Sequence, residues 1–337
     1  MTDLDTGRTG PRPRTGARRG LIARLWRPAF AWPPAAAAGA YALLRVTGAD
    51  RIPGLAFPMA ALLSLTPYAT AAALVAVLVA AALRRRNATI IAVLATAGLA
   101  AAVVPRELRD HQPTATGPTL RILSANLMFS TVDPDYLYNL IRRTHPDLVS
   151  LQEFTPDEAD GLAKAGISQL LPYNLLQPEW GAAGSGLYSR FPLNPLLEPA
   201  TTMRMPRATV DLPEGRQFEM YVVHPLPPIN RDQTRTWLHD LGTLPPAYKD
   251  GPVRVLAGDF NATLDMSPFR TILSHGYADS ADRRGAGLIP TWGVDKFGPP
   301  LSFDHVVVDR RVAVRGYGVH LLPGSDHRAV LAVLQLP

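Results

Sequence analysis

Residues 253–262 read VRVLAGDFNA, and this stretch is the clearest structural signal in the chain. Its apolar, β-branched first half is typical of a buried strand, and Gly258, Asp259, Phe260 and Asn261 follow directly. Asp259 and Asn261 are two residues apart, so in an extended segment their side chains point to the same side. A carboxylate and an amide at a strand end indicate a functional site at a sheet edge, although both residue types also favour ordinary turns.

Other β-like runs also carry an amide, a carboxylate or an imidazole at or next to one end. These runs and their polar residues are 120–124 with Asn126, 147–151 with Glu153, 218–223 with His224, 303–308 with Asp304, and 329–336 preceded by Asp326 and His327. Helix-like patterns are fewer and lie at 136–143, 158–165 and 231–241. This mixture predicts an α/β sandwich of two sheets with helices outside, in which one sheet edge collects the polar residues.

Charge is divided unevenly along the chain. The 337 residues include 34 Lys and Arg and 28 Asp and Glu, a net charge of +6. Residues 1–105 carry a net +9, whereas residues 106–337 carry a net −3 and all eight histidines. The part with the titratable chemistry is therefore not basic, which argues against a nucleic-acid-binding surface there. The chain has no cysteine, which excludes disulfides, thiolate metal sites and cysteine nucleophiles.

The N-terminal third has the composition of a membrane region. Residues 1–20 are rich in Arg, Gly and Pro and predict a disordered basic tail. Three uncharged runs of 17, 32 and 19 residues follow, at 28–44, 52–83 and 87–105. A helix needs about 20 apolar residues to cross a bilayer, so residues 21–105 predict about three transmembrane helices. The alternative is a buried, alanine-rich helical domain, and Pro33 and Pro34 make the first run the weakest span.

Arginine counts predict the orientation of these spans. The stretch that ends at Arg27 holds seven Arg and residues 84–86 hold three, whereas residues 45–51 hold only two. With three spans, the N-terminus is cytoplasmic, and everything after Pro105 is extracytoplasmic in a multi-pass protein of the cell membrane. The orientation becomes ambiguous if the first run does not span. A polar linker is expected at 106–118, before the folded part at 119–337.

Seven segments of this folded part together resemble the endonuclease/exonuclease/phosphatase superfamily. In chain order they are RILSANLMFS (121–130), DLVSLQEF (147–154), GLYSRFPL (186–193), YVVHP (221–225), LAGDFNA (256–262), SFDHVVV (302–308) and GSDHRAV (324–330). The resemblance covers about 119–337 and implies a four-layered α/β sandwich that hydrolyses phosphate esters with Mg²⁺, or alternatively Mn²⁺. The apolar N-terminal segments joined to such a domain further resemble the actinobacterial membrane proteins linked to teicoplanin resistance.

Phosphoryl chemistry explains why such residues are needed. A phosphoryl centre is shielded by its own oxygens, so a hard cation, hydrogen-bond donors and an activated water are required together. Glu153 is expected as a metal ligand, with Asn126 completing or orienting its shell and Asp326 as a further ligand. In the family, the pair equivalent to Asp259 and Asn261 orients the attacking water and binds the phosphate or metal.

The remaining candidates concern proton transfer and phosphate binding. His327 is expected to contact the phosphoryl oxygens or transfer a proton, with Asp304 orienting its imidazole. His224 matches a second family histidine, a candidate general acid for the leaving group, although it could also be a structural imidazole. Arg207 is either a phosphate clamp that binds substrate together with Asn261 or only a charge at a strand start.

Departures from the nuclease branch favour a lipid substrate. DNA-repair members usually have a lysine soon after the Gln-Glu pair, but here residues 154–157 read FTPD. Their Trp-rich stretch is reduced to Thr291-Trp292-Gly293, and residues 106–337 hold no basic cluster with interleaved aromatics. The expected substrate is a phosphorylated or pyrophosphorylated lipid, such as an undecaprenyl carrier, in the lipid bilayer. The alternatives are an extracytoplasmic nuclease acting on DNA or RNA and a catalytically silent membrane binding protein.

Overall fold

The computed structural model describes most of the chain, namely residues 16–52, 54–294 and 298–337. It divides into two compact units. We call the first the helical unit, and it consists of Met1–Leu43 and Ala69–Gly98. We call the second the sheet unit, and it consists of Leu44–Tyr68 and Leu99–Pro337. The predicted boundary near Pro105 therefore does not separate the two units, because a segment within the N-terminal third packs with the sheets.

The helical unit takes its residues from three helices, α1 (Gly16–Thr47), α3 (Thr66–Ala82) and α4 (Arg86–Val103). Among the side chains that the structure describes, the partly buried Val77 and Leu83 pack against a buried cluster made of alanines, namely Ala31, Ala35, Ala76, Ala80, Ala88 and Ala92. Small side chains let helix backbones approach one another closely. The large apolar side chains lie on the outside instead, and Leu78 and Leu94 are 62% and 67% exposed. The large apolar side chains of this unit thus lie on its surface and the small ones in its core.

One described helix, spanning Arg86–Glu107, is long and apolar enough to cross a membrane. Helix α2 (Ala56–Leu63) and α3 pass the same test only together, as a pair that is sharply bent at the break between them. The three predicted spans are therefore not shown, since α1, which contains Pro33 and Pro34, does not pass. The predicted tail lies outside the described residues as far as residue 15, and α1 already begins at Gly16.

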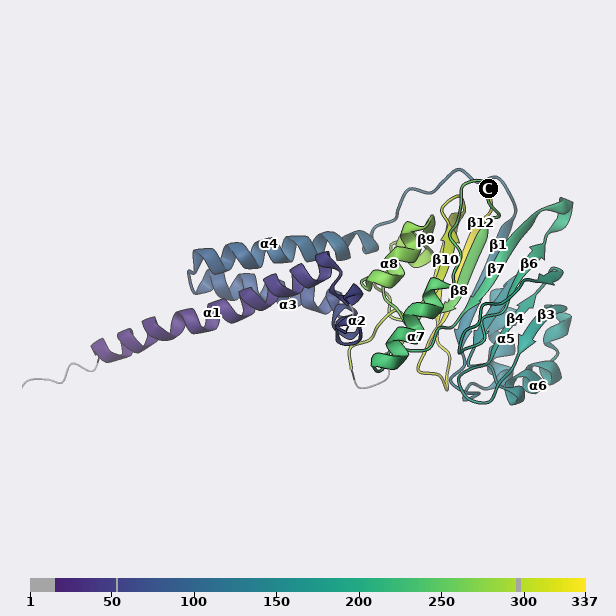
Figure 1. The fold of residues 1–337 in the computed structure, drawn as a ribbon, viewed down its shortest axis with the longest axis horizontal. Coiled ribbons are helices and arrows are strands. Elements are labelled where there is room, and N and C mark those ends of the chain that lie inside the picture. Colours follow the sequence, from purple (N-terminus) through teal and green to yellow (C-terminus); the bar gives the residue numbers. More distant parts are fainter. Residues whose placement is uncertain (1–15, 53, 295–297) are drawn as a thin grey trace, which may run out of the picture. The chain divides into compact units, whose positions relative to one another are not determined.

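The sheet unit contains two mixed six-stranded sheets. Figure 1 shows them packed together with helices outside. The first has the order β11-β12-β1-β2-β4-β3, with β1 Thr119–Asn126, β2 Leu148–Gln152, β3 Tyr173–Gln177, β4 Ser185–Ser189, β11 Ala313–His320 and β12 Ala329–Gln335. The second has the order β5-β6-β7-β8-β10-β9, with β5 Leu193–Pro195, β6 Arg207–Asp211, β7 Gln217–Val223, β8 Arg254–Asp259, β9 Tyr277–Asp279 and β10 Asp304–Asp309.

Helices cover the outer face of each sheet and complete four layers (Figure 1). Apolar side chains of α5 (Pro134–Thr144) and α6 (Pro156–Ala165) pack on β1 and β2, and those of α7 (Arg231–Gly242) and α8 (Ser267–Ser274) pack on β7, β8 and β10. A third apolar cluster fills the space between the sheets. A single turn, α9 (Ser280–Arg283), follows β9. The predicted α/β sandwich is confirmed.

Strand direction brings the polar strand ends together. In each sheet one central pair is parallel, β1 with β2 and β7 with β8, so both strands of a pair end at the same edge. Strand β10 runs antiparallel to β8, and its first residue, Asp304, lies directly opposite Asp259, the last residue of β8. The two sheets therefore present their polar residues at one shared edge.

Within the sheet unit, a buried carboxylate in the loop after β8 holds the segment 44–68 in place. Asp265 accepts hydrogen bonds from Arg45 Nε at 2.9 Å and from both terminal nitrogens of Arg106 at 2.7 and 2.6 Å. Nearby, the backbone N–H of Ser267 donates to Asp50 at 2.6 Å. A buried carboxylate is costly unless it is paired, and here two guanidinium groups satisfy it. We call Arg45, Arg106 and Asp265 the arginine clamp.

Candidate active site

A pocket of about 620 Å³ lies at the shared sheet edge. Its lining includes six of the predicted site residues, Glu153, His224, Asp259, Asn261, Asp326 and His327. Asn126 and Asp304 are fully buried and hydrogen-bond to these residues. A larger groove of about 860 Å³ lies along α7 and α8, but among the described residues none of the predicted catalytic side chains lines it. The chemistry therefore points to the smaller pocket.

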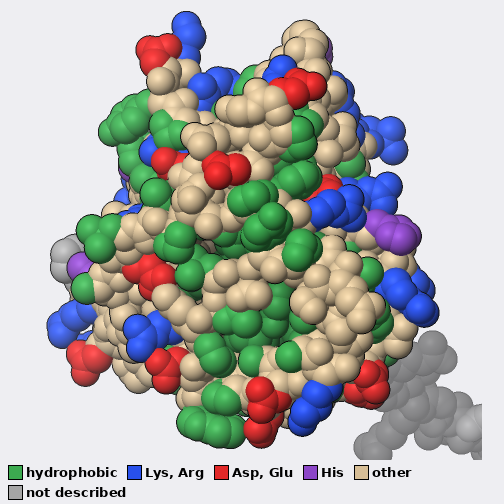
Figure 2. All heavy atoms as spheres, turned by 90° about the vertical axis from the view of Figure 1, so that its right-hand side faces the viewer, with side chains coloured by type: hydrophobic (Ala, Val, Ile, Leu, Met, Phe, Trp, Pro, Cys, Tyr) green, Lys and Arg blue, Asp and Glu red, His purple; other side chains and the backbone are tan. Residues whose placement is uncertain are grey.

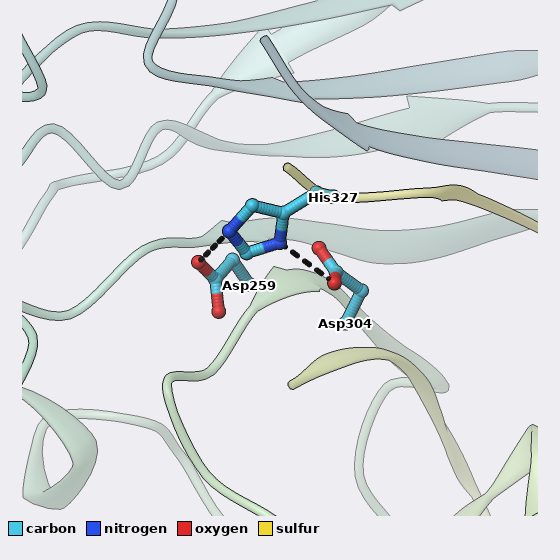
Figure 3. Close-up of side chains that lie close together, drawn as sticks. All are labelled: Asp259, Asp304 and His327. Carbon is cyan, nitrogen blue, oxygen red and sulfur yellow. Dashed lines mark hydrogen bonds and ion pairs between the residues drawn. The ribbon is translucent and has the colours of Figure 1, made fainter. Parts of the chain in front are cut away.

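His327 lies between two carboxylates, as Figure 3 shows. Its Nδ1 lies 2.9 Å from Asp304 Oδ2, and its Nε2 lies 3.7 Å from Asp259 Oδ2. Burial lowers the pKa of His327, but the carboxylates of Asp304 and Asp259 outweigh this and raise it to about 10. At neutral pH the ring is an imidazolium, which donates through Nδ1 to Asp304 and directs Nε2–H toward Asp259. The predicted orienting role of Asp304 agrees with this geometry.

Asn126 connects the two sheets at the site. Its Oδ1 accepts from the backbone N–H of Met128 at 3.0 Å, which fixes the orientation of the amide. Its Nδ2 therefore donates to Glu153 Oε1 and to Asp259 Oδ2, both at 3.1 Å. An NH₂ group cannot bind a cation, so of the two roles considered for Asn126 the geometry favours orienting the carboxylates.

The carboxylates at the site retain unused oxygens. Glu153 Oε2 and Asp304 Oδ1 are buried and have no hydrogen-bond partner among the described residues. Burial raises the pKa of Glu153 to about 7. Ligand atoms of Asp259, Asp304 and His327 lie within 4.8 Å of one another, but a ring protonated on both nitrogens has no lone pair for a cation, so carboxylate oxygens are the available ligands. Buried carboxylate oxygens without partners fit a hard divalent cation such as Mg²⁺ or Mn²⁺.

Asn261 and His224 border the pocket on the side of the second sheet. Asn261 donates its backbone N–H to Asp259 Oδ1 at 2.8 Å and its side-chain NH₂ to the carbonyl of Pro225 at 3.1 Å, and it has a left-handed φ of 49°. His224 is 1% exposed, and burial lowers its pKa to about 4. The imidazole is therefore neutral at pH 7, so the predicted general acid needs a bound phosphoryl group to become charged.

Asp326 lies at the pocket rim, beside Trp292. Its Oδ2 accepts from Trp292 Nε1 at 3.2 Å, and its Oδ1 lies 4.0 Å from His327 Nε2. Trp292 itself lines the pocket, and its ring packs against Phe303 at 5.3 Å between centroids. In the sequence, the Trp-rich stretch of the nuclease members is reduced to Thr291-Trp292-Gly293. In the structure, Trp292 holds the Asp326 carboxylate through its indole N–H.

Arg207 is not at the pocket. Its guanidinium lies 5.5 Å from the ring centroid of Tyr221, and its Nε donates to the carbonyl of Leu197. It begins β6, whose neighbours in the sheet are β5 and β7. Of the two roles considered, the position agrees with a charge at a strand start and not with a phosphate clamp.

Two features of the site have no signal in local sequence. The first is His305, whose Nδ1 and Nε2 lie 2.9 Å from the Asp279 carboxylate and the Ala262 carbonyl. Both partners are acceptors, so both ring nitrogens carry protons, and the cation fixes the loop after Asp259. The second is that the pocket lining includes Ala61, Ser64 and Leu65, which the sequence assigned to the membrane region.

Comparisons with known proteins agree with this fold. A model of the Endonuclease/Exonuclease/phosphatase family matches residues 123–327. A crystal structure of humanized D. rerio TDP2, with 14 mutations, has a TM-score of 0.53 and 20% identity over 64% of this chain and 99% of that chain. The complex of D. rerio TDP2 with a single-strand DNA product has a TM-score of 0.50, with the same identity and coverage. The endonuclease/exonuclease/phosphatase of Beutenbergia cavernae DSM 12333 has a TM-score of 0.47 and 20% identity over 65% and 72%. No curated protein sequence matches the chain.

Proposed function

The chain belongs to the endonuclease/exonuclease/phosphatase family, whose members hydrolyse phosphoester bonds, and we propose that it is a membrane-anchored, metal-dependent phosphoesterase that acts on a lipid phosphate or pyrophosphate. The observation that carries the proposal is the lining of the pocket. It combines the candidate catalytic group around Asp259 and His327 with apolar side chains such as Phe129 and Ile229, which are 50% and 66% exposed. A substrate that carries both a phosphoryl group and a hydrocarbon chain would match the polar and the apolar parts of this lining.

Each polar residue has a role in this reaction. Glu153 and Asp259 would hold the divalent cation, which when bound neutralises phosphoryl charge and activates a water. The His327 imidazolium donates a hydrogen bond from Nε2 to a phosphoryl oxygen, and Asp304 keeps the ring in that orientation. Asn261 holds the Asp259 carboxylate through its backbone N–H. A bound phosphoryl group would raise the pKa of His224, which would take up a proton from solvent and give it to the leaving oxygen.

The helical unit supports a membrane location. Its alanine core and its outward-facing leucines and valines match helices packed in lipid, where small residues mediate contacts and large apolar residues face the chains. In this proposal α1, α3 and α4 cross the cell membrane. In this proposal the N-terminus is cytoplasmic and the active site extracytoplasmic, an orientation supported by seven Arg up to residue 27 and three at 84–86. The substrate is then a lipid of the outer leaflet, such as an undecaprenyl carrier.

Net charge favours this substrate over nucleic acid, since residues 106–337 carry a net −3. On the one face seen in Figure 2, basic and acidic side chains are interspersed around a hydrophobic centre. Non-specific DNA binding depends on several well-placed cations that release counterions. An extracytoplasmic nuclease remains the alternative activity, and the partnered Asp, Asn and His side chains argue against a catalytically silent protein.

Phosphate release by the full-length protein in detergent micelles with Mg²⁺ tests the proposal. The substrates are undecaprenyl pyrophosphate, a phosphatidate and single-stranded DNA, and the variants are Asp259→Ala and, as a control at an exposed site, Asp232→Ala. We expect phosphate from a lipid substrate with the wild type and Asp232→Ala, and none with Asp259→Ala or excess chelator. DNA cleavage without phosphate release from either lipid would replace the proposal by the nuclease, and activity on no substrate would favour the binding protein.

A further inference from the structure

Helix α2 belongs to the wall of the active site. Ala60 is 1% exposed and is part of the apolar cluster that includes Trp237, Phe260 and Met266. The next residue, Ala61, lies on the pocket, together with Ser64 and Leu65 just after the helix. One side of α2 thus completes the core beneath the catalytic loop, while its neighbouring positions face the space that a substrate would fill.

Polar contacts on both sides of α2 hold it in this position. Before the helix, Asp50 accepts from the Ser267 backbone N–H, and Arg45 pairs with Asp265. After it, the Tyr68 hydroxyl donates to the carbonyl of Pro300 at 2.8 Å, between the pocket-lining residues Pro299 and Leu301. The sheet unit therefore uses this segment as one of its own elements, and the pocket is incomplete without it.

The wall that α2 contributes to is apolar and partly open to solvent. Besides Ala61 and Leu65, the apolar lining includes Met203, Ile229, Met266, Leu301 and Phe303. Exposed apolar surface of this kind is costly in water and favours a hydrophobic ligand. A volume of about 620 Å³ is that of a small-molecule pocket, so it holds a headgroup and the first part of a chain.

We propose that α2 and Leu65 form the binding wall for the hydrocarbon chain of the substrate, next to the phosphoryl group at Asp259 and His327. The inference rests on the proposed lipid phosphoesterase function and names the element that selects for a chain. The ligand is a phosphate or pyrophosphate ester of a long apolar alcohol. Its chain could be isoprenoid or acyl, since both present the same CH₂ and CH₃ surface to these side chains.

Two pyrophosphates that differ only in chain length test this assignment. Dimethylallyl and farnesyl pyrophosphate carry the same headgroup, and kcat/KM is measured for both with the full-length protein in detergent. Ala61→Trp places a large ring in the space that the chain would occupy. We expect the farnesyl-to-dimethylallyl ratio of kcat/KM to fall about tenfold, because several chain carbons are then no longer buried. Ala61→Leu should lower the ratio less. Leu55→Trp adds the same ring to an exposed residue of this segment that does not line the pocket, and it should leave the ratio unchanged.

The outcomes separate this inference from the function on which it rests. A wild type that hydrolyses both pyrophosphates, with a ratio unchanged in folded Ala61→Trp and Ala61→Leu, would overturn the chain-binding wall and leave the phosphoesterase intact. A wild type that hydrolyses neither pyrophosphate nor a phosphatidate would overturn both. Thermal unfolding of each variant confirms that it is folded. Repeating the pair with short- and long-chain phosphatidates distinguishes acyl from isoprenoid substrates, since the ratio should fall for the class that the wall binds.

Discussion

His327 lies within 4.0 Å of three carboxylates of the pocket. Asp304 and Asp259 flank its ring, and Asp326 lies 4.0 Å away, so one buried cation serves three carboxylates. Removing a single carboxylate should therefore change the ring's pKa more than it changes the shape of the pocket. Two substitutions at this scale test the assigned charges.

Asp304→Asn should lower the pKa of His327 from its raised value of about 10 toward the ordinary 6.5. A histidine whose pKa is raised on folding stabilises the protein fully below the unfolded value, and this contribution is lost as pH rises through the folded value. In the presence of a chelator, the Tm of the variant should thus be lowest relative to wild type at about pH 6.5 and below, and the difference should narrow toward pH 10. A difference that is constant from pH 7 to 10 would contradict a charged His327.

Glu153→Gln should weaken metal binding. The change keeps the volume and the contact with Asn126 but removes the charge of the buried carboxylate, whose second oxygen has no partner among the described residues. We expect a loss of more than about tenfold in kcat and a higher Mg²⁺ concentration for half-maximal activity, since a misplaced ion removes several kcal/mol of transition-state stabilisation. Glu179→Gln, at an exposed ion pair with Arg204, is the control. Normal turnover at the same Mg²⁺ concentration would exclude Glu153 as the ligand.

At the scale of elements, the segment 44–68 is the part whose role differs most from expectation. Its composition is that of a membrane region, yet Ala60 and Leu63 are buried and the arginine clamp ties it to the loop after β8. A fragment that starts at residue 106 would lack Arg45, α2 and one wall of the pocket. The chain from residue 44 onward, without the helical unit's residues 69–98, is the natural folding unit of the sheets.

Asp265→Asn should destabilise the protein strongly. Asp265 and Arg106 have side chains that are 1% and 7% exposed, so the substitution leaves two buried guanidinium groups without a carboxylate. Breaking a buried pair costs about 3–5 kcal/mol, and chemical denaturation of the full chain in detergent should show a loss of this size. Asp232→Asn breaks the exposed pair with Arg235 and should change stability very little. Equal effects of the two substitutions would mean that the clamp does not hold the segment.

Much of the site could be predicted from the sequence, because each of its motifs is one short, continuous segment. Strand ends at Asn126, His224 and Asp259 follow from short apolar runs, and the family motifs imply their order. The packing of α2 on the pocket could not be predicted, because the same apolar residues satisfy a bilayer and a protein core. The proton on each nitrogen of His305 also depends on partners distant in the chain.

At the scale of the whole molecule, the buried core residues described for the helical unit are alanines, and large apolar side chains such as Leu78 and Leu94 are exposed. Exposed apolar surface is costly in water and suits lipid. One described helix is long and apolar enough to cross a membrane. If the unit spans a membrane as proposed, its topology decides which side the pocket faces.

A reporter that is active only outside the cytoplasm measures this topology. Fused after Pro337 it should be active, and inserted at Arg85 it should be silent, because arginine-rich segments stay in the cytoplasm. The converse reporter, active only in the cytoplasm, should give the opposite pattern at both sites. Activity of the first reporter at Arg85 alone would place the pocket in the cytoplasm and remove outer-leaflet carriers from the candidate substrates.

The left-handed backbone at Glu153 and Asn261 has a consequence for engineering. Their φ values are 55° and 49°, a region that costs most side chains about 1–3 kcal/mol, asparagine less, and glycine almost nothing. Glycine at either position would relax the chain while removing a carboxylate or an amide from the pocket. A library screened only for heat resistance would therefore be enriched in inactive variants at these two positions. The most thermostable variants from such a screen would therefore give little information about the activity of the protein.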